Sequence, residues 1–355
     1  MDNIVKKLVP VLRVENFEGK DNRLEPVKKN ERIFIPTWNN KPAVLPAAIT
    51  LDGLSILTHQ NLSSIIAPPG YGKSSICESI LASYLNPEAD CLGFKVWSGC
   101  QGVIYIDFER TNLDVWNSFY RMCKRADIAE GQDIEGVQIA GMRSIARLEE
   151  RLGAIDTLLQ NNPCSLLLLD GAGDMVTDTN DLQQAIECKI RLRELTVKYD
   201  TSIFTTLHPN PGTDKPRGHI GSEILRESEG VLIVKKGEGD SRIITSDFEH
   251  GKNRNNKPIT TGFAWSDEKM MFVSIDIEGM ADSAKDFKDD QKKQYDINLA
   301  SIVLPLLQSM THTQLIQAII DQKECSKPNA KLDIEKTKTW EIITKGQDGL
   351  YRLKV

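Results

Sequence analysis

The nine residues 67–75 read A-P-P-G-Y-G-K-S-S, and their types suit the binding of a phosphate chain. Backbone N–H groups of a compact loop can surround phosphates, and the N-terminus of a helix behind the loop adds its dipole. Gly70 and Gly72 allow the tight turn and the close approach, Lys73 neutralises phosphate charge, and the Ser74 hydroxyl is a ligand for Mg²⁺. We therefore predict that ATP and Mg²⁺ bind here, at Ala67, Pro68, Pro69, Gly70, Tyr71, Gly72, Lys73, Ser74 and Ser75.

This stretch fits the Walker A pattern G-x-x-x-x-G-K-[S/T], except that Ala67 stands at its first glycine. Alanine costs little at a position whose backbone φ is negative. The apolar residues 63–66 predict a strand before the loop, and residues 74–85 predict a helix after it, which is the context that the pattern requires. The alternative is an ordinary glycine turn in front of a helix.

Carboxylates follow two other apolar runs. "VIYIDFER" contains Asp107 and Glu109, and "SLLLLDGAGD" places Asp170 directly after four leucines. The second run is a Walker B pattern, in which the carboxylate at the end of a strand orients the magnesium shell. We predict that Ser74 and Asp170 hold the metal. The alternative role for Asp170 is to cap the next segment.

Glu109 and His208 are the candidates for the hydrolytic chemistry itself. A carboxylate at the position of Glu109 can take the proton of a water aimed at the γ-phosphate. Asp107 is a rival for this role, and an alternative leaves Glu109 on the surface, paired with Arg110. His208 ends the run "SIFTTLH" behind Thr206 and can donate a hydrogen bond to the γ-phosphate while it stays neutral.

Strand-like and helix-like segments alternate between residues 46 and 275. Buried apolar strands alternating with helices predict an α/β fold with a mostly parallel sheet that is covered on both faces. The last strand candidates follow one another without helices, so we expect an antiparallel extension at one edge. The strand candidates are residues 63–66, 102–106, 165–169, 201–207, 230–234, 242–246 and 271–275, and the helix candidates are residues 74–85, 113–125, 145–159 and 182–199.

The rest of the chain predicts three further parts. Residues 1–45 mix charged residues, Asn and Pro and are interpreted as an N-terminal arm in front of an ATPase domain at 46–280. Residues 281–296 are polar and charged, as is typical of a linker. Residues 297–355 read as helices at 299–310, 313–322 and 328–344 and a final hairpin, which together predict a winged helix-turn-helix domain.

Composition limits where the protein acts and what it binds. The net charge of −6 over 355 residues means that nucleic acid would have to contact a local basic surface. The seven scattered cysteines include no C-x-x-C pair, which argues against a disulfide framework or a zinc site and favours a reducing cytoplasm. The apolar runs are too short to span a bilayer, so no membrane partner is expected.

With these motifs in order, residues 45–275 resemble the RecA-like AAA ATPases grouped with plasmid RepA-type and DnaB-type hexameric helicases of bacterial mobile elements. The resemblance rests on A-P-P-G-Y-G-K-S, I-Y-I-D-F-E-R, L-L-L-L-D-G-A-G-D-M, T-T-L-H, R-G-H-I-G-S and the K-N-R-N segment from Lys252. It implies a RecA-like P-loop NTPase core, with Glu109 as the base and His208 as the γ-phosphate sensor.

The resemblance also implies a homo-oligomeric ring, expected to be a hexamer, in which a neighbouring subunit completes each site. Lys252 and Arg254 are then the cationic groups that reach the neighbour's γ-phosphate, with Arg217 as a competing finger. Residues 209–221 lie where such rings place a DNA loop in the channel, and Lys215 and Arg217 are candidates for contacts to single-stranded DNA. The alternative for K-N-R-N-N-K is an ordinary basic turn.

In the C-terminal domain, Lys327, Lys331 and Lys338 are candidates for DNA contacts in a major groove, although acidic residues nearly balance them. The alternative is a protein-docking module. The predicted function is an ATP-hydrolysing, ring-forming DNA helicase or translocase in replication or transfer of a plasmid or mobile element, with replication or mobilisation proteins as further partners. One alternative is a DNA-binding ATPase switch that loads or regulates another machine, and another is a regulator without enzymatic activity.

Overall fold

The computed structural model describes residues 44–276 except 238, 247–249 and 255–256, and residues 309–354 except 324 and 340–341, with isolated positions at 34, 38, 41, 42 and 306. The chain divides into two units, residues 1–45 and 46–355. Most of the predicted N-terminal arm, the predicted linker at 281–296 and most of the predicted helix at 299–310 lie outside the described residues.

A large mixed sheet is formed by strands between residues 62 and 275. Its strand order is β13-β12-β10-β9-β3-β8-β7-β5-β6, and β11 pairs with β9. The strands from β9 to β6 in this order are parallel, whereas β10, β12 and β13 are antiparallel. The predicted α/β class, the mostly parallel sheet and the antiparallel extension are therefore confirmed. The strands are β3 (Leu62–Ile66), β5 (Val103–Asp107), β6 (Val137–Gly141), β7 (Leu166–Asp170), β8 (Ser202–Leu207), β9 (Gly230–Lys236), β10 (Ser241–Thr245), β11 (Lys252–Asn253), β12 (Thr260–Ser266) and β13 (Met271–Ile275).

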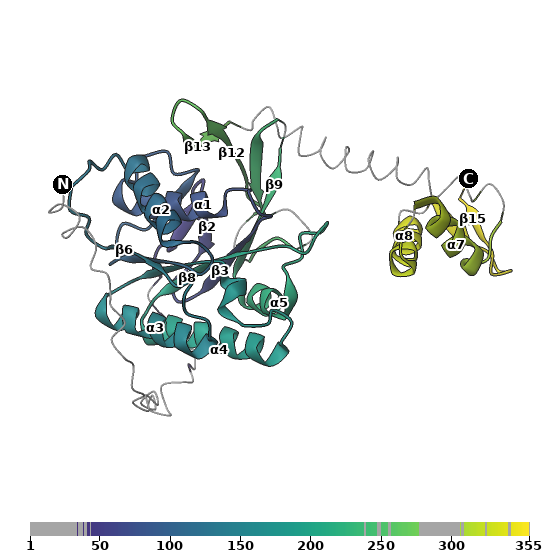
Figure 1. Cartoon of the computed structure of the whole chain (residues 1–355), viewed down its shortest axis with the longest axis horizontal. Coiled ribbons are helices and arrows are strands. Elements are labelled where there is room, and N and C mark those ends of the chain that lie inside the picture. The colour runs from purple at the N-terminus through teal and green to yellow at the C-terminus, as the bar shows by residue number, and fades with distance from the viewer. Residues whose placement is uncertain are drawn as a thin grey trace. The chain divides into compact units, whose positions relative to one another are not determined.

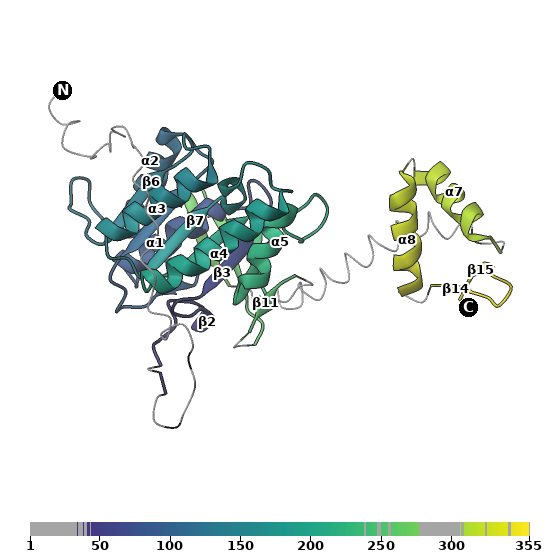
Figure 2. The ribbon, with the colours of Figure 1, turned by 90° about the horizontal axis from the view of Figure 1, so that it is seen from below.

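Helices cover both faces of this sheet (Figure 1). They are α1 (Lys73–Leu85), α2 (Asn112–Arg125), α3 (Leu148–Asn161), α4 (Leu182–Lys198) and α5 (Gly218–Glu227). The leucines of β7 alternate between the two cores: Leu166 and Leu168 pack on the side of α1 and α2, and Leu167 and Leu169 on the side of α3, α4 and α5. Figure 2 looks onto this second face and shows its helices lying across the sheet. A run of four leucines is explained by burial on both faces.

A smaller antiparallel sheet of order β2-β1-β4 adds to the first core. It consists of β1 (Ile49–Leu51), β2 (Leu54–Leu57) and β4 (Phe94–Val96). These strands and β6 were not predicted, because each is short or carries too little apolar alternation to stand out.

The register of the parallel strands brings their carboxyl ends to one edge of the sheet. Ile66 of β3 is level with Leu207 of β8, and Asp107 of β5 is level with Asp170 of β7. The residues that follow these four strands must therefore lie near one another. We call the carboxyl ends of β3, β8, β7 and β5 the site edge.

The C-terminal residues build a core of their own. Helices α7 (His312–Lys323) and α8 (Lys327–Thr339) pack with the hairpin of β14 (Ile343–Lys345) and β15 (Tyr351–Leu353). The prediction of a helix as far as residue 344 was wrong, because Ile343 is buried and begins β14. The predicted terminal hairpin is present.

Within the described residues, no helix has both the length and the apolar surface that crossing a bilayer requires. All seven cysteines are free thiols.

Candidate active site

Residues 67–72, here called the glycine loop, connect β3 to α1 at the site edge. Gly70 has φ 77° and Gly72, the N-cap of α1, has φ 87°, so both take the left-handed conformation that favours glycine. Ala67 is fully buried, is not among the residues with positive φ, and donates its N–H to the carbonyl of Leu207 at 3.0 Å. The backbone therefore accepts alanine at this position without strain.

Lys73 begins α1 and turns its ammonium group back towards the glycine loop. Its Nζ lies 3.1 Å from the Ala67 carbonyl, 3.4 Å from the Pro68 carbonyl and 3.3 Å from Nδ1 of His208. Burial lowers the pKa of Lys73, and the nearby carboxylates of Asp170 and Glu109 oppose that shift. The loop thus has a buried amine at its centre, where a phosphate would be expected to displace the two carbonyl contacts.

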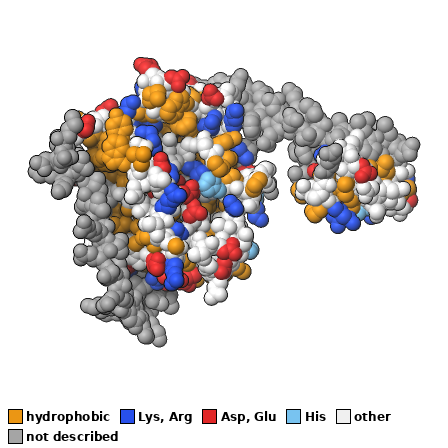
Figure 3. Space-filling model, in the orientation of Figure 1, with side chains coloured by type: hydrophobic (Ala, Val, Ile, Leu, Met, Phe, Trp, Pro, Cys, Tyr) orange, Lys and Arg blue, Asp and Glu red, His pale blue; other side chains and the backbone are white. Residues whose placement is uncertain are grey.

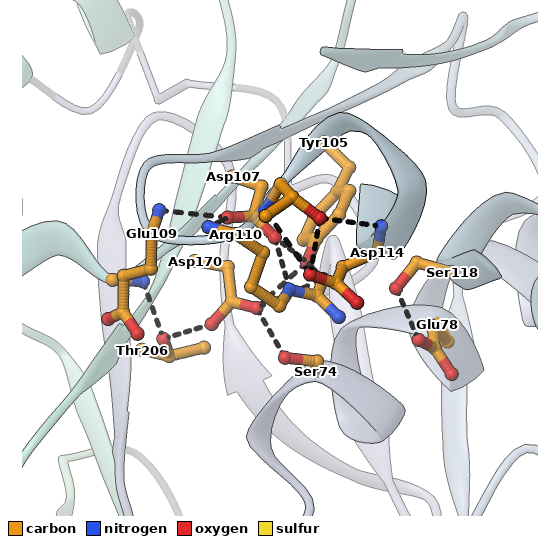
Figure 4. Close-up of polar contacts among 12 residues, drawn as sticks. Ser74, Glu78, Tyr105, Asp107, Glu109, Arg110, Asp114, Ser118, Asp170 and Thr206 are labelled. Atoms are coloured by element: carbon orange, nitrogen blue, oxygen red, sulfur yellow. Dashed lines mark hydrogen bonds and ion pairs between the residues drawn. The ribbon is translucent and has the colours of Figure 1, made fainter. Parts of the chain in front are cut away.

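Asp170 at the end of β7 gathers hydroxyl groups from three other elements (Figure 4). Its Oδ2 accepts hydrogen bonds from Ser74 Oγ at 2.7 Å and from the Tyr105 hydroxyl at 2.8 Å, and its Oδ1 accepts one from Thr206 Oγ1 at 2.6 Å. The predicted pair of metal ligands, Ser74 and Asp170, is therefore in direct contact although the two residues lie on different elements.

The donor chemistry of this pair fits Mg²⁺. A hydroxyl and a carboxylate are hard oxygen ligands, and Mg²⁺ is usually held by one or two such groups together with phosphate oxygens and water. The described residues contain no group of three or more His, Cys, Asp or Glu side chains arranged to bind a metal ion by themselves. The Ser74–Asp170 pair by itself would leave most coordination positions of a metal ion to other ligands.

Asp107 is engaged in structural bonds and is poorly suited to be the base. It is 1% exposed, and its Oδ1 accepts the backbone N–H groups of Glu109 and Arg110 at 2.9 and 2.8 Å. The Arg110 guanidinium pairs with Oδ2 of Asp107 and lies 3.7 Å from Oδ2 of Asp170. The structure argues against two of the sequence alternatives: Asp107 as the base, and Arg110 as the partner of Glu109.

Glu109 lies beyond the end of β5 with its carboxylate directed away from Asp107 (Figure 4). Its Oε1 is 3.3 Å from Nε2 of His208, and its side chain is 35% exposed. The hydrogen bond from His208 lowers the pKa of Glu109 and outweighs the opposing effect of burial. Glu109 is therefore a carboxylate that water can reach.

His208 connects the lysine to this carboxylate. The Lys73 ammonium can only donate, so Nδ1 of His208 accepts and the proton of a neutral ring is on Nε2, from which it is donated to Glu109. Lys73, His208 and Glu109 come from three elements and form one hydrogen-bonded chain. Sequence analysis identified these three residues, missed Tyr105, and considered Arg110 only as a surface partner of Glu109. Tyr105 reads as a core residue, while the spacing of Arg110 three residues after Asp107 was a usable signal.

Lys252 and Arg254 lie far from this chain of bonds within one molecule. Lys252 is level with Val231 at the start of β9, and Val231 is in turn level with Ser64 of β3, away from the site edge. Its Nζ donates to the Leu225 carbonyl at 2.9 Å, and burial lowers its pKa. Arg254 is exposed. Neither residue belongs to its own chain's candidate site.

The segment after His208 is shorter and more ordered than the predicted loop at 209–221. A bridge between Pro209 and Pro216 closes it, and α5 already begins at Gly218. Lys215 and Arg217 are exposed near the site edge. The face of the molecule seen in Figure 3 carries basic and acidic side chains interspersed, so a broad basic surface is not formed there.

Of the lysines predicted for the C-terminal domain, Lys327 and Lys331 are exposed on α8. Lys338 is engaged, since its Nζ lies 2.7 Å from Glu335 and 5.3 Å from the centre of the Tyr351 ring. It is therefore a weaker candidate for a DNA contact than the other two.

No protein-family model matches this chain, and no curated protein matches it either. Its function is therefore inferred from the side chains at the site edge.

Proposed function

We propose that this protein is an ATPase with a RecA-like P-loop core that works in a ring as a DNA helicase or translocase. The observation that carries the proposal is the convergence of Lys73, the Ser74–Asp170 pair and the Glu109–His208 pair at one sheet edge. A phosphate-binding amine, a hard metal site and an accessible base within hydrogen-bond reach of one another are what hydrolysis of a phosphoanhydride needs.

Each side chain has a distinct task under this proposal. The glycine loop and Lys73 bind the β- and γ-phosphates, and Ser74 and Asp170 hold Mg²⁺, which supplies charge neutralisation when bound. Glu109 accepts the proton of the attacking water, and His208 keeps Glu109 oriented through the Nε2 hydrogen. Tyr105, Thr206 and Arg110 hold Asp170 from the side of the core.

A ring accounts for the exposure of Arg254 and its distance from its own site. In the ring, Arg254 and Lys252 of one subunit would stabilise the charge that develops on the γ-phosphate of the next. Lys252, which already donates to the Leu225 carbonyl, would then act mainly by fixing the turn that carries Arg254.

DNA is the proposed partner of the exposed cations. Lys215 and Arg217 lie near the site edge, so strand binding and nucleotide state can be coupled over a short distance. The two C-terminal helices and the hairpin fit a winged helix, with Lys327 and Lys331 as its contacts to the DNA backbone.

The experiment is ATP turnover with and without single-stranded DNA, together with the mass of the assembly. We expect a ring whose turnover rises with DNA and is abolished by Lys73→Ala, whereas Lys95→Ala, at an exposed position of β4, leaves it unchanged. Turnover that does not respond to DNA would contradict the helicase part. Stimulation without strand displacement would favour an ATPase switch that acts on another protein machine.

A further inference from the structure

Gly171, the residue directly after Asp170, lies against the side chain of Glu109. A Cβ atom placed on Gly171 would be 2.4 Å from Oε1, 2.7 Å from Cγ and 2.9 Å from Cδ of Glu109. Such distances are far inside van der Waals contact. The carboxylate occupies its present position only because residue 171 has no side chain.

The backbone of Gly171 is held on both sides. Its N–H donates to Thr206 Oγ1 at 2.9 Å, and Thr206 in turn donates to Asp170 Oδ1 at 2.6 Å. Its carbonyl accepts the N–H of Asp174 at 2.8 Å, within the turn that leads into the 3₁₀ helix Ala172–Met175. Its φ is 79°, a conformation that favours glycine. Thr206 and Asp170 are both buried, so the surface offered to Glu109 is fixed by the core.

Glu109 is thus confined both by hydrogen bonding and by packing. His208 Nε2 lies 3.3 Å from Oε1, and the Gly171 backbone packs against the same oxygen and the two carbons behind it. The side chain of Asp174 also hydrogen-bonds to this carboxylate. Hydrogen bonds fix where the oxygens point, and packing against a rigid backbone further limits the three side-chain torsions to few positions.

We propose that Gly171 is a positioning residue, whose backbone holds the carboxylate of Glu109 in the position required for hydrolysis. This inference rests on the proposed function, because it gives Glu109 the task of base. Gly171 touches no reacting atom, so it acts only through Glu109. An added methyl group would displace the carboxylate by about 1 Å, a shift that can cost roughly 100-fold in rate.

The test compares Gly171→Ala with Gly173→Ala, a matched control in the same turn, where a Cβ meets no atom within 4 Å. For Gly171→Ala we expect kcat for ATP to fall by about 10- to 100-fold, with the affinity for a fluorescent ATP analogue unchanged. Gly173→Ala should keep wild-type kcat. Equal losses of kcat and of analogue affinity would overturn the proposal, because the glycine would then serve the Asp170 metal site.

A second measurement separates the contact from the strain of a positive φ. Gly171→Ala is also made in a Glu109→Ala background, where the three clashing atoms are absent. Gly171→Ala changes the unfolding equilibrium constant by some factor in each background. We expect this factor to be at least about threefold smaller in the Glu109→Ala background than in the wild-type background. Equal changes in both backgrounds would overturn the proposal. Absence of ATPase activity in the wild type would instead contradict the proposed function, and the base-positioning role with it, even where this coupling persists.

Discussion

At the scale of single residues, the candidate site is defined by which carboxylates are already engaged. Asp170 accepts hydrogen bonds from Ser74, Tyr105 and Thr206, and Asp107 binds the turn that follows it. Glu109 interacts with His208 and with the side chain of Asp174, and it keeps a third of its surface open. These three carboxylates therefore differ in how far their oxygen atoms are already engaged.

Replacing Glu109 with glutamine tests the task of base. Glu109→Gln keeps the size and the acceptor for His208 but cannot take a proton, so kcat for ATP should fall by about 10²- to 10⁴-fold. Binding of an ATP analogue should persist, as measured by fluorescence titration. Glu150→Gln, on the exposed face of α3, is the control and should match the wild type. An active Glu109→Gln variant would remove Glu109 from the chemistry.

Tyr105→Phe tests the support of Asp170 from the core. The substitution removes the hydroxyl that donates to Asp170 at 2.8 Å and accepts from Arg110 Nη2 at 2.6 Å. Because Asp170 is buried and Arg110 is half-buried, we expect a loss of about 1–3 kcal/mol in the free energy of unfolding. Urea denaturation measures it, with the exposed Tyr120→Phe as control. A loss no larger than that of Tyr120→Phe would mean that the hydroxyl contributes nothing.

At the scale of elements, the site depends on short connections from parallel strands. Two register pairs, Ile66 with Leu207 and Asp107 with Asp170, align the ends of the strands. Each following loop starts within a residue or two of these pairs. The antiparallel strands on the other side of β9 contribute through packing: a Cβ on Gly72 would lie 3.1 Å from the Phe263 ring of β12. The glycine loop is thus held between the parallel strands and the antiparallel extension.

The attachment of β13 predicts a pH-dependent stability. Asp90 accepts hydrogen bonds from Ser274 N at 2.9 Å and Ser274 Oγ at 2.6 Å. Burial acts to raise the pKa of Asp90, but these bonds outweigh it and the pKa is lowered on folding. The contribution of these bonds to the free energy of unfolding is therefore complete above the unfolded-state pKa of Asp90, about 3.9. It is lost as the pH falls through the folded-state pKa, which is lower.

Asp90→Asn should accordingly destabilise the protein by roughly 1 kcal/mol at pH 7. The difference in free energy of unfolding between this variant and the wild type should become smaller as the pH is lowered from 5 towards 3, as measured by urea denaturation at each pH. Asp133→Asn, at an exposed position, should show no such difference. A difference that stays constant over the whole pH range would show that titration of Asp90 does not contribute.

At the scale of the whole molecule, the main question is whether a second subunit completes the site. Arg254 is exposed and lies at the end of β9 that is remote from the glycine loop, so its own site does not use it. A guanidinium that arrives only on assembly would tie hydrolysis to ring formation.

Mixing two inactive variants tests this arrangement. Arg254→Ala subunits keep an intact glycine loop, and Lys73→Ala subunits keep Arg254, so a mixed ring contains some complete sites. We expect each variant alone to lack ATPase activity and the mixture to regain a measurable part of it. A mixture of Arg254→Ala with the double variant Lys73→Ala/Arg254→Ala is the control and should stay inactive. The same test is made with Arg217→Ala subunits mixed with Lys73→Ala subunits. If ATPase activity returns in that mixture and not in the one with Arg254→Ala, Arg217 is the finger instead.

The sequence predicted the main elements well where their patterns were strong. The run of leucines before Asp170 and the apolar run before Ala67 both lie at the centre of the sheet, where burial on two faces removes the need for polar alternation. The strands β1 and β4 were missed, since three residues give too little periodicity. The strand β6 is as long as β7 but was missed because it contains Gln, Ala and Gly and none of its residues is fully buried. The helix predicted through residue 344 failed because β-branched residues at 342–344 turn into a strand that pairs with β15.

By itself, the sequence determined which residue types are present for the chemistry: the glycine loop with its lysine and serine, and acidic or basic residues after successive strands. Only the tertiary structure decided which carboxylate stays accessible. Asp107 and Glu109 are two residues apart and equally acidic in sequence, but the turn after β5 engages one and directs the other towards His208 and Gly171. The partners that make this distinction lie about a hundred or about sixty residues further along the chain. Local sequence patterns carry no information on such contacts, because they form only when the strands take their register.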